Sequence, residues 1–164
     1  IRPPSFQKLG GLYLGESMNI IRAHLQHTDL IAPLFDAYRQ FYKADSDLEA
    51  SREFIHQRLA NDESIIFLAL DGDTAIGFVQ LYPLFASVAL QSLWLLNDLY
   101  VDPSARKQGT GEALMHEAED FARDTNSRGL FLRTATDNIP AQRLYERCGW
   151  VRDEKFYRYD KILK

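Results

Sequence analysis

Eleven residues, Val101 to Gly111 (VDPSARKQGTG), have the composition of an anion-binding loop. They follow an apolar stretch at 93–100 that is typical of a buried strand, and they lead into Glu112 to Asn126, where apolar residues recur at helical spacing. Glycines let a ligand approach the backbone closely, and the first N–H groups of a helix point at an anion. Arg106 and Lys107 add positive charge there. The segment therefore predicts a site for a phosphate-bearing ligand.

Three known phosphate-binding patterns can be compared with this loop. The mononucleotide P-loop needs Gly-x-x-x-x-Gly-Lys-Ser/Thr, which the chain lacks. The dinucleotide fingerprint needs a small residue three positions after its second glycine, where this chain has Leu114. The third pattern, Arg/Gln-x-x-Gly-x-Gly/Ala, is met by Arg106, Gly109 and Gly111.

The elements that must position this loop follow from hydrophobic periodicity and from turn residues. Strands are expected at 19–24, 64–70, 74–82, 93–100 and 129–134, with one or two more within 150–163. Helices are expected at 28–42, from 48 to 59, at 112–126 and at 138–147, and a loop is expected at 83–92. This order predicts a mixed α/β fold (an α+β mixed sheet), with antiparallel hairpins around one parallel crossover.

Length and composition narrow the class of protein. The chain has 164 residues, a net charge of -4 and one cysteine, Cys148. This balance argues against a dedicated nucleic-acid binder, and no apolar run approaches the roughly 20 residues of a membrane-spanning helix. A single cysteine favours the reducing cytoplasm. We expect residues 1–17 to be a non-native leader or tag, Met18 to be the natural start, and 18–164 to form one domain.

Two segments together resemble the GNAT superfamily of N-acetyltransferases: LNDLYVDPSARKQGTGEAL at 96–114 and DNIPAQRLYERCGW at 137–150. The resemblance is greatest to the branch that acetylates polyamines and histone tails. It implies a central mixed sheet flanked by helices, in which the fourth and fifth strands splay apart. It also implies acetyl-CoA as co-substrate. No metal is expected, because the four histidines of the chain show no metal-ligand spacing.

The resemblance further implies roles for individual residues. Tyr145 matches the acid that protonates the leaving thiolate, although a tyrosine at this spacing also suits core packing. Asp98 is the candidate base, acting directly or through water, and a carboxylate satisfied at a strand bulge is the alternative. The implied acetyl-CoA contacts are Leu99, Tyr100, Val101, Arg106, Lys107, Gln108, Gly109, Thr110, Gly111 and Asn138. For Asn138, capping of a helix is an equally good explanation.

The predicted function is transfer of acetyl from acetyl-CoA to a primary amine of a small amine, a polyamine or a lysine. Transfer is expected to be direct, within a ternary complex. The acceptor site is expected between the first two helices and the 83–92 loop, with an aromatic wall of Tyr38, Tyr42, Tyr82 and Phe85. The alternatives are an aminoglycoside-type acetyltransferase and a non-catalytic acyl-CoA sensor. A homodimer is expected through the aromatic segment Phe156 to Tyr159.

Overall fold

The computed structural model describes residues 18–163, in two compact units. The first unit ends at Arg133, and the second begins at Thr134. The leader expected at residues 1–17 lies outside the described residues. The prediction of one domain over 18–164 stays a prediction.

The first unit is a mixed sheet with three long helices, and the second contains one helix. The sheet has the strand order β1-β2-β3-β4-β5, in which β5 runs parallel to β4 and the other neighbours are antiparallel. The mixed α/β fold is therefore confirmed. The elements are β1 (Met18–Arg22), α1 (Thr28–Phe41), α2 (Leu48–Ala60), β2 (Ile65–Asp71), β3 (Thr74–Ala86), β4 (Gln91–Val101), α3 (Thr110–Asp124), β5 (Leu130–Leu132) and, in the second unit, α4 (Ile139–Arg147).

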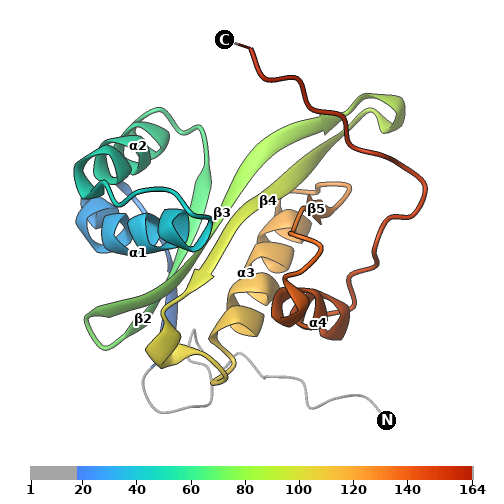
Figure 1. Ribbon diagram of the computed structural model, residues 1–164. Coiled ribbons are helices and arrows are strands. Elements are labelled where there is room, and N and C mark those ends of the chain that lie inside the picture. Colours follow the sequence, from blue (N-terminus) through green and yellow to red (C-terminus); the bar gives the residue numbers. More distant parts are fainter. Residues whose placement is uncertain (1–17, 164) are drawn as a thin grey trace. The chain divides into compact units, whose positions relative to one another are not determined.

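Helices cover both faces of the sheet, with α1 and α2 on one face and α3 on the other (Figure 1). Side chains of a strand alternate between faces, so β3 and β4 supply both cores. Phe78 of β3 packs on Phe35 of α1 with ring centroids 6.2 Å apart. On the opposite face, Phe67 of β2 lies 5.6 Å from Phe121 of α3. These two aromatic contacts distinguish the α1 face of the sheet from the α3 face.

A β-bulge interrupts β4 close to its C-terminal end. Gln80 of β3 is opposite Asp98, but the next residue, Leu81, is opposite Leu96, so Asn97 is an extra residue. An inserted residue reverses the alternation of side chains beyond it. Leu96 consequently shares the α3 face with Leu81, while Asp98 faces α1.

The ladder between β4 and β5 is short. Only Trp94 to Leu96 pair with Leu130 to Leu132, whereas β4 continues to Val101. Residues 97–101 thus extend beyond the last β5 partner, which agrees with the expected splay of the fourth and fifth strands. The backbone groups on that edge of β4 have no β5 partner, and apart from the Val101 carbonyl, which accepts from Arg106 Nε, they can pair with a ligand that lies alongside the strand.

The prediction of a loop at 83–92 is wrong, because most of this segment is paired strand. Residues Tyr82 to Ala86 pair with Gln91 to Leu95, so β3 and β4 form one long hairpin whose tip is a 3₁₀ turn at Ser87–Ala89. Pro83 misled the prediction because proline lacks the N–H that a ladder uses. Continued cross-strand pairing with 91–95 overrides that local signal.

The prediction of one or two strands within 150–163 is also wrong, because residues 151–163 form no strand. Their aromatic residues Phe156, Tyr157 and Tyr159 are exposed. Phe156 and Tyr157 are adjacent, so they cannot both bury on one face of a strand. A strand also needs a backbone partner, which composition cannot supply. Across residues 18–163, no helix is long and apolar enough to cross a membrane.

Candidate active site

The β4 bulge places Asp98 in a nearly closed environment on the α1 face. The residue is 5% exposed, and both of its carboxylate oxygens accept hydrogen bonds from Nδ2 of Asn97 at 3.1 Å. Burial raises the pKa of Asp98 above its usual 3.8, and hydrogen bonds from Asn97 and Tyr38 partly offset that rise. A buried carboxylate with a raised pKa is suited to accept a proton near neutral pH.

Aromatic side chains surround this carboxylate. The hydroxyl of Tyr38 of α1 is shared between the Asn97 carbonyl, at 3.4 Å, and the Asp98 carboxylate. The ring centroid of Tyr38 is 6.5 Å from that of Tyr100. On its side toward solvent, Tyr38 packs against the half-exposed Tyr42, and the two ring centroids are 5.1 Å apart. Burial, and secondarily the charge of Asp98, raises the pKa of Tyr82 to about 12, so Tyr82 remains a neutral phenol. Three members of the predicted aromatic wall therefore share the α1 face.

Phe85, the fourth predicted member of that wall, is elsewhere. It follows Tyr82 by three positions on a regular part of β3, and strand alternation puts it on the other face. Its side chain is 82% exposed at the hairpin tip. Residues of a loop do not alternate between the two faces of a sheet, so the predicted loop at 83–92 gives no reason to separate Phe85 from Tyr82.

A carboxylate on α1 organises the connection between α1 and α2, beside Tyr38 and Tyr42. The Asp36 carboxylate accepts hydrogen bonds from Ser46 Oγ at 2.7 Å, the Asp47 amide at 2.8 Å and Ser51 Oγ at 3.2 Å. These bonds, with that of Ser46 the strongest, hold the pKa of Asp36 below its usual value. The connection is thereby fixed against α1.

The loop between β4 and α3 is held by its own polar groups. Asp102 accepts a hydrogen bond from the Ser104 amide at 2.9 Å, and Gln108 Nε2 donates to the Ser104 carbonyl at 3.1 Å. The buried hydroxyl of Thr110 donates to the Ala105 carbonyl at 3.2 Å. The loop is thus held by hydrogen bonds between its own residues, which suits a preformed anion site.

The start of α3 has the geometry that the glycine pattern predicts. Lys107 and Gly109 have left-handed backbones, with φ of 63° and 88°, and a side chain at Gly109 would meet nothing within 4 Å. The Ala113 amide makes the first backbone bond of the helix, to the Gly109 carbonyl at 2.9 Å. The amides of Thr110 and Gly111 precede it and have no acceptor within the helix. The residues present therefore fit an anionic diphosphate at this helix start.

The residues between the bulge and the loop divide between the two faces. Tyr100 packs toward α1, whereas Leu99 and Val101 lie opposite Val79 and Gly77 on the other face. Arg106 folds against the end of β4. Its Nε donates to the Val101 carbonyl at 2.9 Å, and its guanidinium is 5.7 Å from the Tyr100 ring.

Asn138 and Tyr145 belong to the second unit and are described within it. Asn138 caps α4, since its side chain accepts from the Ala141 amide at 3.4 Å. The Tyr145 ring lies 6.4 Å from that of Trp150. The capping role considered for Asn138 is present, and its acetyl-CoA contact stays a prediction.

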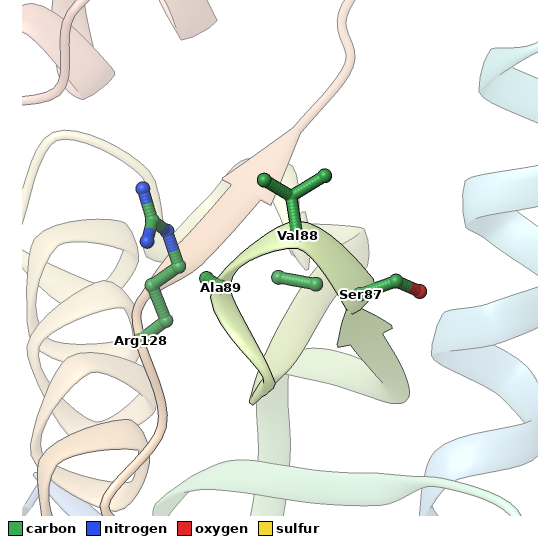
Figure 2. A pocket seen from close by; sticks show the side chains of 5 residues that line it. Ser87, Val88, Ala89 and Arg128 are labelled. Carbon is green, nitrogen blue, oxygen red and sulfur yellow. The ribbon is translucent and has the colours of Figure 1, made fainter.

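A hollow of about 380 Å³ lies at the hairpin tip, away from Asp98 along β3 and β4. Figure 2 shows Ser87, Val88, Ala89 and Arg128 around it. Its lining consists of small residues, of which Ser87 is polar, and of Arg128, whose guanidinium would repel an ammonium group. We therefore place the candidate active site at Asp98 and the α3 start. Within residues 18–163, no three His, Cys, Asp or Glu side chains are grouped to hold a metal ion.

One residue of the Asp98 environment was not singled out from the sequence. Gln80 is fully buried and lies opposite Asp98 across the β3–β4 ladder. A signal was present, because Gln80 is a polar residue within the apolar run from Ile76 to Tyr82. The bulge register that places it against Asp98 has no such signal.

Comparison with known proteins bears on this site. Residues 31–150 match the family model described as the acetyltransferase (GNAT) family. An uncharacterized N-acetyltransferase, YhfO of Bacillus subtilis, is 42% identical over 142 residues, covering 87% of this chain and 95% of the relative. A probable acetyltransferase of Haemophilus influenzae is 33% identical over 141 residues, covering 79% and 97% respectively. The crystal structure of a probable acetyltransferase superposes with a TM-score of 0.84 at 42% identity, covering 89% of this chain and 98% of that one.

Proposed function

Because the chain belongs to the acetyltransferase (GNAT) family, we propose that it acetylates the primary amine of a small amine, a polyamine or a lysine side chain. Dependence on acetyl-CoA follows from the family itself. The observation that supports an amine acceptor is the buried, aromatic-lined carboxylate of Asp98. It lies on the same strand that leads into the α3 anion site. A carboxylate among aromatic rings favours a cation.

We assign the diphosphate of acetyl-CoA to the loop and to the start of α3. The amides of Thr110 and Gly111 face the anion, and the positive end of the helix stabilises it. Lys107 and Arg106 add charge at the rim. The arm of the co-substrate runs along the edge of β4 at Leu99 to Val101, where β5 no longer pairs. Gln108, Gly109 and Asn138 complete the predicted contacts.

The chemical step requires two proton movements. An ammonium has no lone pair, so one N–H bond breaks, its proton passes to Asp98 directly or through water, and the electron pair stays on nitrogen. That nitrogen then forms a bond to the acetyl carbon, the carbon–sulfur bond breaks, and nitrogen releases a second proton to water. We assign Tyr145 as the acid that protonates the departing sulfur. Direct transfer of this kind needs no acyl-enzyme.

An aminoglycoside acceptor is the second candidate. An aminoglycoside N(6')-acetyltransferase type 1 of Stenotrophomonas maltophilia is 26% identical over 114 residues, covering 66% of this chain and 74% of the relative. Aminoglycosides are polycations, so the net charge of -4 suits them as well as polyamines. A sensor that binds acyl-CoA without turnover is the non-enzymatic alternative.

Three further parts of the proposal concern context. Among GNAT branches we favour the polyamine and histone-tail type, on the resemblance of LNDLYV. A homodimer is favoured by the exposed aromatic residues Phe156, Tyr157 and Tyr159, which association would bury. A cytoplasmic location is favoured by the single cysteine.

The deciding experiment measures thiol release from acetyl-CoA with a panel of polyamines, lysine peptides, simple amines and aminoglycosides. We expect turnover with a primary amine, and an acidic limb of the kcat/KM profile that disappears in Asp98→Asn. Turnover restricted to aminoglycosides would favour the second candidate. Tight binding of acetyl-CoA without turnover on any amine would refute the enzymatic proposal.

A further inference from the structure

The side chain of Gln80 ends in a buried oxygen that has no donor among the described residues. Gln80 is 0% exposed, and its Nε2 donates to Ser64 Oγ at 2.7 Å. Its Oε1, at the other end of the amide, is buried without a hydrogen-bond partner in residues 18–163. Buried carbonyl oxygens are rarely left in this state, because leaving one unsatisfied costs stability. A glutamine at this position therefore calls for a function that offsets the loss of stability.

The register of the sheet and the bond to Ser64 indicate which side the oxygen faces. β3 lies between β2 and β4, and Ser64 immediately precedes β2. The amide nitrogen is thus tied toward β2, which leaves the oxygen available on the β4 side. Directly opposite Gln80 on β4 is Asp98, and both residues share the α1 face with Phe78. Opposite residues of an antiparallel pair have Cβ atoms about 5 Å apart.

Two tyrosines interact electrostatically with Asp98, and two further charged groups act on one of these tyrosines. α1 contributes Tyr38, which donates to the carboxylate of Asp98, and β3 contributes Tyr82. Arg58 of α2 and Glu63, which precedes β2, act with opposite sign on Tyr82. Asp98 itself lies opposite Gln80 and becomes a hydrogen-bond donor when it takes up a proton.

We propose that Gln80 is a positioning residue for the base: its Oε1 accepts a hydrogen bond from the O–H that Asp98 gains from the acceptor ammonium. The inference rests on the proposed function, in which Asp98 is that base. When the N–H bond of the ammonium breaks, an O–H bond forms on Asp98, and Gln80 Oε1 accepts a hydrogen bond from that O–H. Asn97 and Tyr38 donate to the charged form, so the two protonation states have separate partners.

This arrangement has a definite effect on the acidity of Asp98. Hydrogen bonding to the neutral acid, together with repulsion between the Gln80 oxygen and the carboxylate, raises the pKa of Asp98. The effect adds to that of burial. It also explains why the amide is tied to Ser64, because a free amide would turn its N–H groups toward the carboxylate and lower that pKa.

The test follows the titration of Asp98 itself. Protein labelled with ¹³C at the aspartate carboxyl carbon is titrated by NMR, with Asp98→Asn assigning the signal, and the kcat/KM profile is recorded alongside. Gln80→Met keeps the volume and removes the oxygen. Leu81→Met is the matched control, since Leu81 is equally buried but faces α3.

We expect Gln80→Met to lower the pKa of Asp98 by roughly 0.5–1 unit, with the acidic limb of kcat/KM moving equally, while Leu81→Met moves neither. Ser64→Ala, which frees the amide nitrogen and leaves the core volume almost unchanged, should lower it in the same direction. Ser64→Ala thus provides the same test if the Gln80→Met protein does not fold.

An unchanged pKa of Asp98 in these variants would overturn the proposal, as would a raised one, which would mean that the amide N–H faces the carboxylate. If the Asp98 signal moves but the acidic limb stays, the contact with Gln80 is upheld and the role of Asp98 as base is refuted. The failure of the inference and the failure of the proposed function are therefore distinguishable.

Discussion

The Asp36 carboxylate determines how firmly the connection between α1 and α2 is held, and replacing it with alanine tests this directly. The side chain is 8% exposed. It accepts hydrogen bonds from Ser46 Oγ, the Asp47 amide and Ser51 Oγ, and also from Gln40 Nε2 at 2.8 Å. Asp36→Ala removes the common acceptor of all these hydrogen bonds at once.

The magnitude depends on which donors can return to water. Ser46 and Gln40 are exposed and can be resolvated, whereas Ser51 is 1% exposed and the Asp47 amide is fixed at the start of α2. A hydrogen bond to a charged acceptor contributes about 1.5–3 kcal/mol, and proximity to solvent favours the lower end. We expect the free energy of unfolding to fall by about 3 kcal/mol, a drop in Tm of roughly 6–12 °C.

The assay is urea and thermal unfolding followed by circular dichroism, with Asp45→Ala as control. Asp45 is an exposed carboxylate in the same connection, and its removal should change stability by less than about 0.5 kcal/mol. An Asp36→Ala protein as stable as the Asp45→Ala control would refute the reasoning.

The same contribution has a predictable dependence on pH. Hydrogen bonds hold the pKa of folded Asp36 below its ordinary value of 3.8, which the unfolded chain retains. Charged Asp36 therefore stabilises the fold fully above about pH 4 and loses this effect as pH falls through the lower, folded pKa. The stability difference between wild type and Asp36→Asn should shrink correspondingly in acid. A constant difference down to low pH would contradict the assignment.

Three other substitutions give separate tests. Gly109→Ala forces alanine into a backbone with φ of 88°, at a cost of about 1–2 kcal/mol, and should raise KM for acetyl-CoA several-fold. Its control is Gly72→Ala, at φ of 57° in the β2–β3 turn, which should lose comparable stability without the rise in KM. Gly77→Ala would place a Cβ 2.8 Å from the Tyr100 carbonyl oxygen and should destabilise the protein by about 1–3 kcal/mol in urea unfolding. Tyr145→Phe should lower kcat at neutral pH without weakening acetyl-CoA binding by calorimetry, and unchanged turnover across pH would refute its role as acid.

The parts of the fold that the sequence predicts correctly are those with strong local causes. Gly109 and the helical spacing after it predict the start of α3 to within two residues of Thr110. Asn138 similarly predicts the cap of α4. The parallel β5 follows from the crossover that a helix of this length imposes.

The parts that it does not predict depend on pairing between strands. The extra residue Asn97 becomes visible only when β4 is aligned with β3, and without it the face occupied by Asp98 is ambiguous. The same alignment turns Gln80 from an isolated polar residue into the partner of Asp98. The hairpin at 83–92 escapes prediction because proline suppresses the local signal while long-range pairing sustains the strand.

The bulge at Asn97 also affects which genetic changes this strand can survive. Substitutions at position 97 alter one side chain, but loss of a single codon there would restore regular alternation through β4. Either Asp98 and Tyr100 would then turn toward α3, or Leu96 and Trp94 would turn toward α1. Point substitution and in-frame deletion at one site would thus differ sharply in effect. Lineages that retain the activity should conserve the number of residues in β4.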